Sequence, residues 1–135
     1  MSQTTKTVLI VDDLPANRYV VCRMLKHAQY ATIEAASSGE AIEKARRHRP
    51  DAIVLDMNLP DQNGVATLKK LRANTETAAI PVLILSADAQ SAFDKNSAEA
   101  FGASAYLFTP VPAETLVCVL NGIIERGVDS HDMAM

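Results

Sequence analysis

Three aspartates stand directly after short apolar runs of this 135-residue chain, where a charged side chain is unusual. Asp12 and Asp13 follow "VLIV", and Asp56 follows "AIVL". If the two runs are neighbouring parallel strands, which lie about 5 Å apart, the three carboxylates share one small space. Asp13 could instead cap a helix that begins near Pro15. Because three carboxylates at one edge repel one another without a counter-ion, the pattern favours a divalent cation, and oxygen ligands of this kind suit Mg²⁺.

Two later apolar runs end in residues that carry a hydroxyl group. Ser86 ends the run "PVLILS", and its hydroxyl could donate a hydrogen bond to a phosphoryl oxygen or cap the following helix. The last run ends at Thr109 and Pro110, and a proline at a strand end fits a cis peptide in a tight turn. Asp88 could flank the same phosphoryl group or cap a helix, and both interpretations stay open on the sequence alone.

The elements that must position these side chains follow from the hydrophobic pattern. Short apolar runs alternate with segments whose apolar residues recur at helical spacing. The expected strands are residues 7–11, 31–36, 52–56, 81–87 and 104–108, and the expected helices are residues 15–28, 37–48, 63–73, 90–102 and 112–127. Ser37 and Glu40 have the spacing of a capping box at the start of the second helix.

Strict alternation of strands and helices predicts an α/β fold with a parallel sheet between two helical layers. Each connection between neighbouring parallel strands is right-handed and needs a helix, so helices should cover both faces of the sheet. The strands at 7–11, 52–56 and 81–87 are the most uniformly apolar and should be central. Ligands bind such sheets outside the carboxyl ends of the strands, which is where Asp56 and Ser86 stand.

The charge pattern argues against nucleic-acid binding, and the apolar pattern argues against a membrane span. The formal net charge is −3, and apart from Arg46, Arg47 and Arg49, which we expect at a solvated helix end, the basic residues are scattered. Nothing therefore predicts nucleic-acid binding. No apolar stretch approaches the roughly 18 residues of a membrane span, and the first residues do not resemble a signal peptide. Cys22 and Cys118 have no CxxC spacing or histidine partner, so we expect packed thiols in a reducing cytoplasm.

Four motifs at consistent spacing resemble those of one known family. The stretches "VLIVDD", "DAIVLDMNLPDQNG", "PVLILSA" and "GASAYLFTP" are similar to the receiver domain of bacterial two-component response regulators. The resemblance covers residues 7–126, between a short extension at 1–6 and a tail at 127–135, and the member it resembles is the single-domain chemotaxis regulator. It implies a flavodoxin-like (βα)5 three-layer sandwich with strand order 2-1-3-4-5.

The resemblance also implies roles for the acidic residues. Asp56 matches the aspartate that accepts a phosphoryl group from a histidine kinase or a phosphotransfer protein. Asp12 and Asp13 match the acidic pair that binds Mg²⁺ together with Asp56 and the backbone carbonyl of Asn58. The expected chemistry is limited to Mg²⁺-dependent self-phosphorylation and autodephosphorylation of Asp56, so an enzyme with a separate substrate is not expected.

Two further residues match the switch of the family, and one departs from it. The hydroxyl of Ser86 matches the group that binds the phosphoryl oxygens, and Tyr106 matches the aromatic that then moves inward. The family has a lysine where this chain has Thr109. Beside Asp56 and Ser86, Thr109 would be the third residue at the reacting group, and it offers only a neutral hydroxyl. A hydrogen bond to a charged group contributes roughly 1.5–3 kcal/mol. Thr109 is therefore either a tolerated variant of a working receiver or a sign of weak switching. Nothing in the sequence predicts that Lys95 reaches the site in place of the missing lysine.

We expect a stand-alone receiver that signals through a protein partner. The resemblance places the partner on the surface of residues 90–102, 104–108 and 112–127, around Tyr106. The alternative within the family is a phosphate-independent interaction module. Two other classes with a related fold fit less well: a flavodoxin-type flavin binder needs a phosphate cradle where this chain has "DDLPAN", and a haloacid-dehalogenase phosphatase needs an aspartate where it has Asn58.

Overall fold

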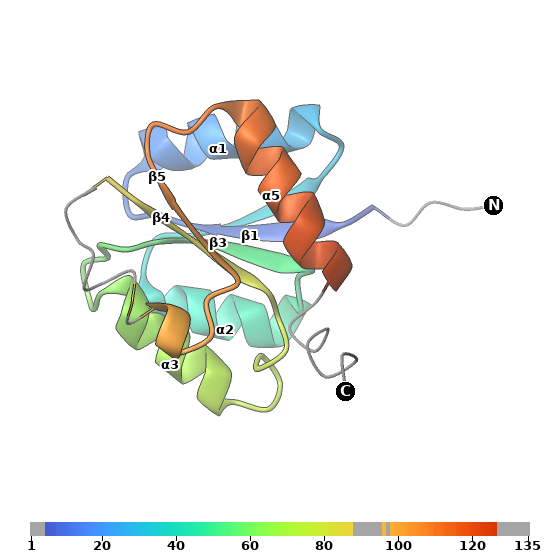
Figure 1. Cartoon of the computed structure of the whole chain (residues 1–135). Helices are drawn as coiled ribbons and strands as arrows, with labels where there is room; N and C mark the ends of the chain where they lie inside the picture. The colour runs from blue at the N-terminus through green and yellow to red at the C-terminus, as the bar shows by residue number, and fades with distance from the viewer. Residues whose placement is uncertain (1–4, 88–95, 97, 127–135) are drawn as a thin grey trace.

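A computed structural model describes residues 5–87, 96 and 98–126 of the chain, and shows one parallel sheet between two layers of helices (Figure 1). The five strands follow the predicted order, β2-β1-β3-β4-β5. They are β1 (Thr7–Val11), β2 (Ala31–Ala35), β3 (Ala52–Asp56), β4 (Val82–Ser86) and β5 (Ala105–Phe108). The four strand pairs are parallel, which is the arrangement expected of a chain that alternates strands with helices.

Helices cover both faces of the sheet. They are α1 (Pro15–His27), α2 (Ser38–His48), α3 (Gly64–Ala73) and α5 (Ala113–Arg126). α1 and α5 lie on one face, and α2 and α3 lie on the other (Figure 1). Of the helix expected at residues 90–102, residues 96 and 98–100 are helical, while 90–95 and 97 lie outside the described residues. Among the helices of the described part, none has the length and apolarity needed to cross a membrane.

β1 is an interior strand of the sheet, between β2 and β3, and both of its faces are apolar. Leu9 and Val11 pack in the core beneath α2 and α3, whereas Val8 and Ile10 pack in the core beneath α1 and α5. These four side chains are at most 1% exposed. The alternation of a strand thus divides one apolar run between two cores, which is why the run contains no polar residue before Asp12.

The start of α2 confirms one half of the predicted capping box. Ser37 is the N-cap, and its hydroxyl accepts a hydrogen bond from the backbone N–H of Glu40 at 3.2 Å. The Glu40 carboxylate accepts a hydrogen bond from the backbone N–H of Ala36 at 2.8 Å. Ser37 therefore satisfies one N–H group that the helix would otherwise leave without a partner, whereas Glu40 binds the N–H of the residue before the N-cap and not that of Ser37.

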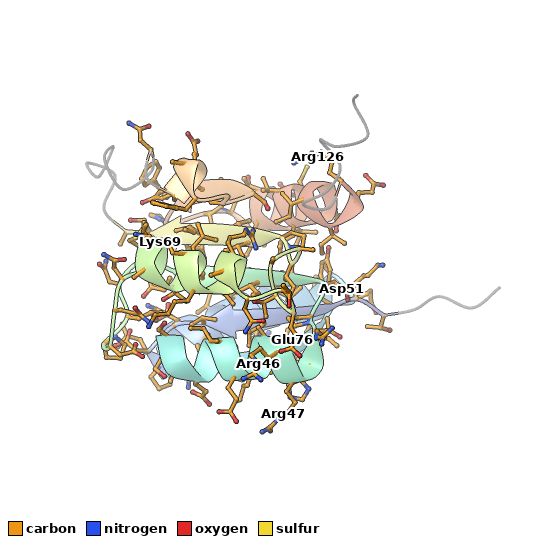
Figure 2. All side chains as sticks on the ribbon, turned by 90° about the horizontal axis from the view of Figure 1, so that it is seen from below. Arg46, Arg47, Asp51, Lys69, Glu76 and Arg126 are labelled. Atoms are coloured by element: carbon orange, nitrogen blue, oxygen red, sulfur yellow. The ribbon has the colours of Figure 1, made fainter. Side chains whose placement is uncertain are left out.

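The arginines at the end of α2 form a solvent-exposed charged surface, as expected. Arg46 and Arg49 pair with Glu76 at 2.9 and 3.4 Å, and Arg47 pairs with Glu43 at 3.0 Å (Figure 2). Exposed pairs of this kind contribute at most about 1 kcal/mol each. Each of the three arginines is thus paired with a nearby carboxylate, and Glu76 is shared by two of them.

Only one of the two cysteines is packed. Cys22 is buried in α1, whereas Cys118 is exposed on α5. α5 buries Leu116, Leu120 and Ile123, which recur at helical spacing on the side toward the sheet, and residue 118 lies outside this stripe. The expectation of a packed thiol is therefore wrong for Cys118.

Arg72 of α3 connects the segments that precede β4 and β5. Its guanidinium donates a hydrogen bond to the carbonyl oxygen of Ile80 at 2.8 Å and two to that of Gly102 at 2.9 and 3.2 Å. Gly102 has a φ of +95°, and a Cβ atom there would lie 3.0 Å from Nε of Arg72. The backbone conformation and the close contact both favour glycine at this position.

Candidate functional site

The carboxyl ends of β1 and β3 bring three carboxylates together. The two strands pair in register, with Val11 opposite Leu55, so the residues that follow Val11 and Leu55 emerge at one edge of the sheet. One carboxylate oxygen from each of Asp12, Asp13 and Asp56 lies within 4.8 Å of the others. Asp12 and Asp56 are half-buried, and Asp13 is exposed. The structure thus brings together the three aspartates that the sequence singled out.

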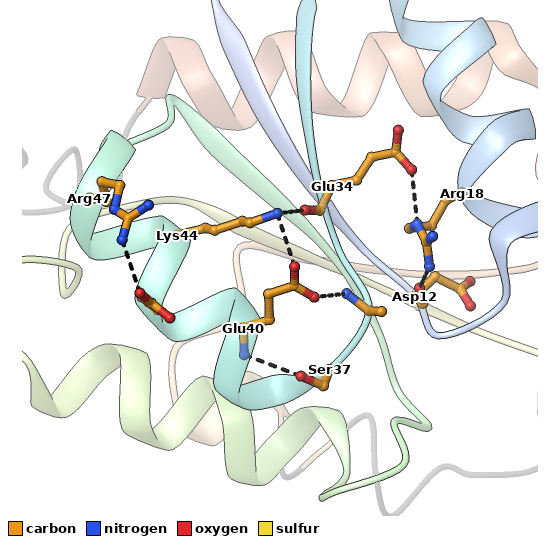
Figure 3. Close-up of polar contacts among 9 residues, drawn as sticks. Asp12, Arg18, Glu34, Ser37, Glu40, Lys44 and Arg47 are labelled. Atoms are coloured by element: carbon orange, nitrogen blue, oxygen red, sulfur yellow. Dashed lines mark hydrogen bonds and ion pairs between the residues drawn. The ribbon is translucent and has the colours of Figure 1, made fainter.

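The turn from β1 into α1 holds Asp12 in place. Its Oδ1 accepts a hydrogen bond from the backbone N–H of Leu14 at 3.0 Å. Arg18 donates to the carbonyl oxygen of Asp12 at 2.7 Å while it pairs with Glu34 at 2.9 Å (Figure 3). The N-cap of α1 is Leu14 rather than Asp13, so the capping role considered for Asp13 is wrong. Its carboxylate instead lies close to those of Asp12 and Asp56, and we call these three carboxylates the acidic corner.

Burial and neighbouring charges act on Asp56. Burial raises the pKa of Asp56 from its usual 3.8 to about 6, and the negative charges of Asp12 and Asp13 act in the same direction. Hydrogen bonds from the backbone N–H groups of Asn58 and Met57 oppose this rise in pKa. Among the described residues, none of the ion pairs involves the three aspartates. A set of carboxylate oxygens whose charges repel one another fits a hard divalent cation such as Mg²⁺.

The loop between β3 and α3 turns back onto the end of β3. The backbone N–H of Gly64 donates to the carbonyl oxygen of Met57 at 2.6 Å, and Asn58 forms an isolated antiparallel bridge with Asn63. A Cβ atom at position 64 would lie 3.0 Å from Cα of Met57 and 3.1 Å from the carbonyl oxygen of Asp56. This close approach requires glycine. The loop thereby keeps the peptide of Asn58 beside the Asp56 carboxylate.

Ser86 is the last residue of β4 and Thr109 directly follows β5, so both stand at the same edge of the sheet. Ser86 ends β4 and is 1% exposed. The backbone N–H of Thr109 donates to the carbonyl oxygen of Ser86 at 2.9 Å, and the peptide bond between Thr109 and Pro110 is cis. Thr109 and Pro110 line a pocket of about 290 Å³ that Asp12, Asp56 and side chains of α1 also line. Thr109 therefore shares one cavity with two members of the acidic corner.

Tyr106 packs away from this pocket. It lies opposite Ile84 of β4, is partly buried against the core beneath α2 and α3, and its ring centroid is 5.3 Å from that of Phe108. Asp88 and Lys95 lie outside the described residues, so the structure does not test their predicted places.

The sequence did not indicate two side chains that support the corner. Arg18 binds the carbonyl oxygen of Asp12, and Asp61, in the loop after β3, accepts hydrogen bonds from the backbone N–H groups of Ser38 and Gly39 at 2.9 and 3.0 Å. The available signals were an arginine in the first turn of a helix and an aspartate after a proline. Neither pattern predicts a partner on another element of the fold.

The comparison with known families is decisive. The model of the response regulator receiver domain matches residues 8–121 of the chain. The chain belongs to the response regulator receiver family. Protein PilH of Pseudomonas aeruginosa is 34% identical to this receiver over 117 residues, which cover 87% of the chain and 96% of PilH.

Solved structures of other receivers share the fold. The chemotaxis response regulator CheY4 of Vibrio cholerae is 33% identical, with a TM-score of 0.81 over 89% of this chain and 99% of that one. The receiver domain of the sensor histidine kinase PA1611 from Pseudomonas aeruginosa is 29% identical, with a TM-score of 0.83 over 90% of this chain and 99% of that one. That structure has a magnesium ion coordinated in its active-site cleft. These likenesses confirm the predicted flavodoxin-like fold.

Proposed function

We propose that this receiver accepts one phosphoryl group on Asp56, from a histidine kinase or a phosphotransfer protein, and passes the signal to a protein partner. The main support is the convergence of Asp12, Asp13 and Asp56, whose carboxylate oxygens lie within 4.8 Å of one another. This convergence stands at the carboxyl ends of two central strands, the edge at which open α/β sheets bind ligands. Membership of the receiver family supports the same assignment.

The reaction assigned to Asp56 is attack of a carboxylate oxygen on phosphorus. An oxygen–phosphorus bond forms while the bond between phosphorus and the imidazole nitrogen of the donor breaks, and the donor nitrogen keeps the electron pair. Asp56 must be ionised to attack, and with a pKa of about 6 it is mostly ionised at neutral pH. As the last residue of a buried strand, Asp56 is held in a fixed direction, and positioning is a large part of phosphoryl transfer.

The carboxylates of Asp12, Asp13 and Asp56, together with the backbone carbonyl of Asn58, would hold a Mg²⁺ ion. When bound, the ion supplies positive charge that offsets the repulsion between the carboxylate and the phosphoryl oxygens. Asp12 and Asp13 thus act in the proposal as ligands and not as acceptors. The magnesium ion in the cleft of the PA1611 receiver domain supports this assignment.

The hydroxyl groups of Ser86 and Thr109 are assigned to the phosphoryl oxygens. Thr109 lines the same pocket as Asp56 and supplies a neutral hydroxyl where the family has a lysine. This departure favours a second candidate function, a receiver that binds its partner with little dependence on phosphate. In the first case phosphorylation moves Tyr106 and changes partner affinity, and in the second it does neither.

The partner is assigned to the surface around Tyr106, on β5, α5 and the segment that precedes β5. The match to PilH covers 96% of that protein, so a receiver with little other sequence has a precedent in the family. By this likeness we assign residues 7–126 to the receiver unit, between 1–6 and 127–135, and the proposed output is a protein partner. A cytoplasmic location is part of the proposal, supported by the free thiols of Cys22 and Cys118.

Incubation with acetyl phosphate and Mg²⁺, followed by measurement of the intact mass, tests the proposed acceptor. We expect one added phosphoryl group on the native protein, and none when Mg²⁺ is chelated or in Asp56→Asn. Asp51→Asn is the matched control, because Asp51 stands just before the same strand and asparagine keeps an acceptor for the backbone N–H of Thr7. Uptake that persists in Asp56→Asn would assign the phosphoryl group to another residue.

A further inference from the structure

We propose that Asp61 is a positioning residue for the metal site, because it binds the start of α2 and thereby holds the loop that carries Asn58. The inference rests on the proposed Mg²⁺ site and adds to it a residue that is not a ligand. Asp61 lies in the loop between β3 and α3, and Asn58 and Asn63 close this loop through their isolated bridge. Asp61 therefore stands inside the closed segment.

Both carboxylate oxygens of Asp61 are used on α2. Oδ1 accepts a hydrogen bond from the backbone N–H of Ser38 at 2.9 Å, and Oδ2 accepts one from Gly39 at 3.0 Å. The first N–H groups of a helix have no partner within the helix and carry partial positive charge, which favours a carboxylate. The hydrogen bond from Ser38, and then that from Gly39, hold the pKa of Asp61 below its usual range. The contact is therefore charged at neutral pH.

A second contact joins the same loop to the same helix. The side-chain amide of Gln62 donates to the hydroxyl oxygen of Ser38 at 2.6 Å, and the hydroxyl of Thr67 in α3 lies 2.8 Å from the same oxygen. Ser38 and Thr67 are fully buried. Two consecutive residues of the loop are thus bound to Ser38, Asp61 to its backbone N–H and Gln62 to its hydroxyl, and Asp61 supplies the charged part of this attachment.

The attachment matters for the metal because the loop presents both a ligand and a partner of Asp56. The backbone N–H of Asn58 donates to the Asp56 carboxylate, and the carbonyl of the same residue is the proposed ligand. Groups that orient metal ligands typically change metal affinity by about 10- to 100-fold when they are removed. Asp61 acts one step further away, through the backbone of the loop, so a smaller effect is expected.

Three variants separate positioning from general stability. Asp61→Ala removes both hydrogen bonds to α2, and Asp61→Asn keeps one acceptor oxygen without the charge. Ser37→Ala is the matched control: Ser37 caps the same helix, but its hydrogen bond goes to Glu40 within α2 and not to the loop (Figure 3). The control therefore weakens the start of α2 and leaves the attachment of the loop intact.

The test is a titration of the unphosphorylated proteins with Mg²⁺ alone, followed by amide NMR shifts, since the chain has no tryptophan for fluorescence. We expect the Kd for Mg²⁺ to rise about 3- to 10-fold in Asp61→Ala and less in Asp61→Asn, and to change less than about twofold in Ser37→Ala. In the metal-free proteins, amide hydrogen exchange at Asn58 should become faster in Asp61→Ala and stay unchanged in Ser37→Ala.

Each outcome has a separate meaning. Native protein that does not bind Mg²⁺ would overturn the metal site itself, and the role of Asp61 with it. Native protein that binds Mg²⁺, with the same Kd in Asp61→Ala, would overturn the positioning role alone. An equal loss of affinity in Asp61→Ala and Ser37→Ala would also overturn it, because the effect would then follow the stability of α2 and not the attachment of the loop.

Discussion

In the absence of a divalent cation, we expect Asp56→Asn to make the protein more stable at neutral pH. Burial raises the pKa of Asp56 to about 6, so the folded protein holds a proton that the unfolded chain releases near pH 4. Ionising Asp56 therefore destabilises the folded state. Asparagine has nearly the same shape, carries no charge, and keeps an oxygen that can accept the hydrogen bond from the backbone N–H of Asn58.

The raised pKa sets the size of the effect. A rise from 3.8 to about 6 corresponds to about 3 kcal/mol for a group fully removed from water. Asp56 is only half-buried, and solvent screening reduces this value to about 1–2 kcal/mol. Coulomb's law gives the same order of magnitude: at 4.8 Å, the upper limit of the distances between the three oxygens, two unit charges repel by about 1 kcal/mol in water and by about 3.5 kcal/mol at an effective dielectric constant near 20.

The pH dependence has a definite sign. Well below pH 4, Asp56 is protonated in both the folded and the unfolded protein, so the penalty is absent. As the pH rises toward and past 6, the folded protein must release a proton that it holds more tightly, and the penalty reaches its full size. The free energy of unfolding of Asp56→Asn should exceed that of the native protein by about 1–2 kcal/mol near pH 7.5 and by only about a fifth of this near pH 4.

Urea unfolding followed by circular dichroism, in the presence of EDTA and at both pH values, measures this difference. Asp51→Asn controls for the loss of an aspartate at the opposite end of β3. Millimolar Mg²⁺ should stabilise the native protein by mass action and reduce the advantage of Asp56→Asn. The reasoning is refuted if Asp56→Asn is the less stable protein near pH 7.5 in EDTA, or if the difference is the same at both pH values.

Three further changes have expected outcomes. Millimolar Mg²⁺ should raise the Tm of the native protein and should raise that of Asp13→Ala much less, and equal increases would remove Asp13 from the ligand set. Thr109→Lys should enlarge the phosphate-dependent amide NMR shifts at Ser86 and Tyr106, because an ammonium adds a contact worth roughly 1.5–3 kcal/mol; unchanged shifts would show that the lysine is dispensable here. Arg72→Met should lower the free energy of unfolding in urea by about 1–3 kcal/mol, because two carbonyl groups lose their donor, and a loss below about 0.5 kcal/mol would count against that account.

The elements of the fold could be predicted because their signals are local. The apolar run before Asp12 indicated a strand buried on both faces, and Ser37 and Glu40 indicated the start of α2. The meeting of Asp12 with Asp56 was also predictable, although the two are far apart in the chain. A parallel sheet places the carboxyl ends of its strands at one edge, so the pairing of two buried strands was sufficient.

Contacts between side chains of different elements could not be predicted in this way. Asp61 and Ser38 are 23 residues apart, and their hydrogen bond depends on how the loop after β3 meets the start of α2. The bond from Arg18 to the carbonyl oxygen of Asp12 depends likewise on the turn into α1. Cys118 was misjudged for a related reason: its apolar neighbours indicated a buried helix, but the side of α5 that faces the sheet is fixed by packing.

The three hydrogen bonds of Arg72 give β5 one fixed end. They bind carbonyl oxygens next to the amino ends of β4 and β5, whereas the acidic corner lies at the carboxyl ends of the sheet. A rearrangement that begins at Thr109 would therefore act on a strand that is anchored near Gly102. We expect such a strand to tilt about its anchor and not to slide, so that its displacement increases from Gly102 to Thr109. Tyr106 stands between these two points, at a position where a tilt turns the ring relative to the core as well as shifting it.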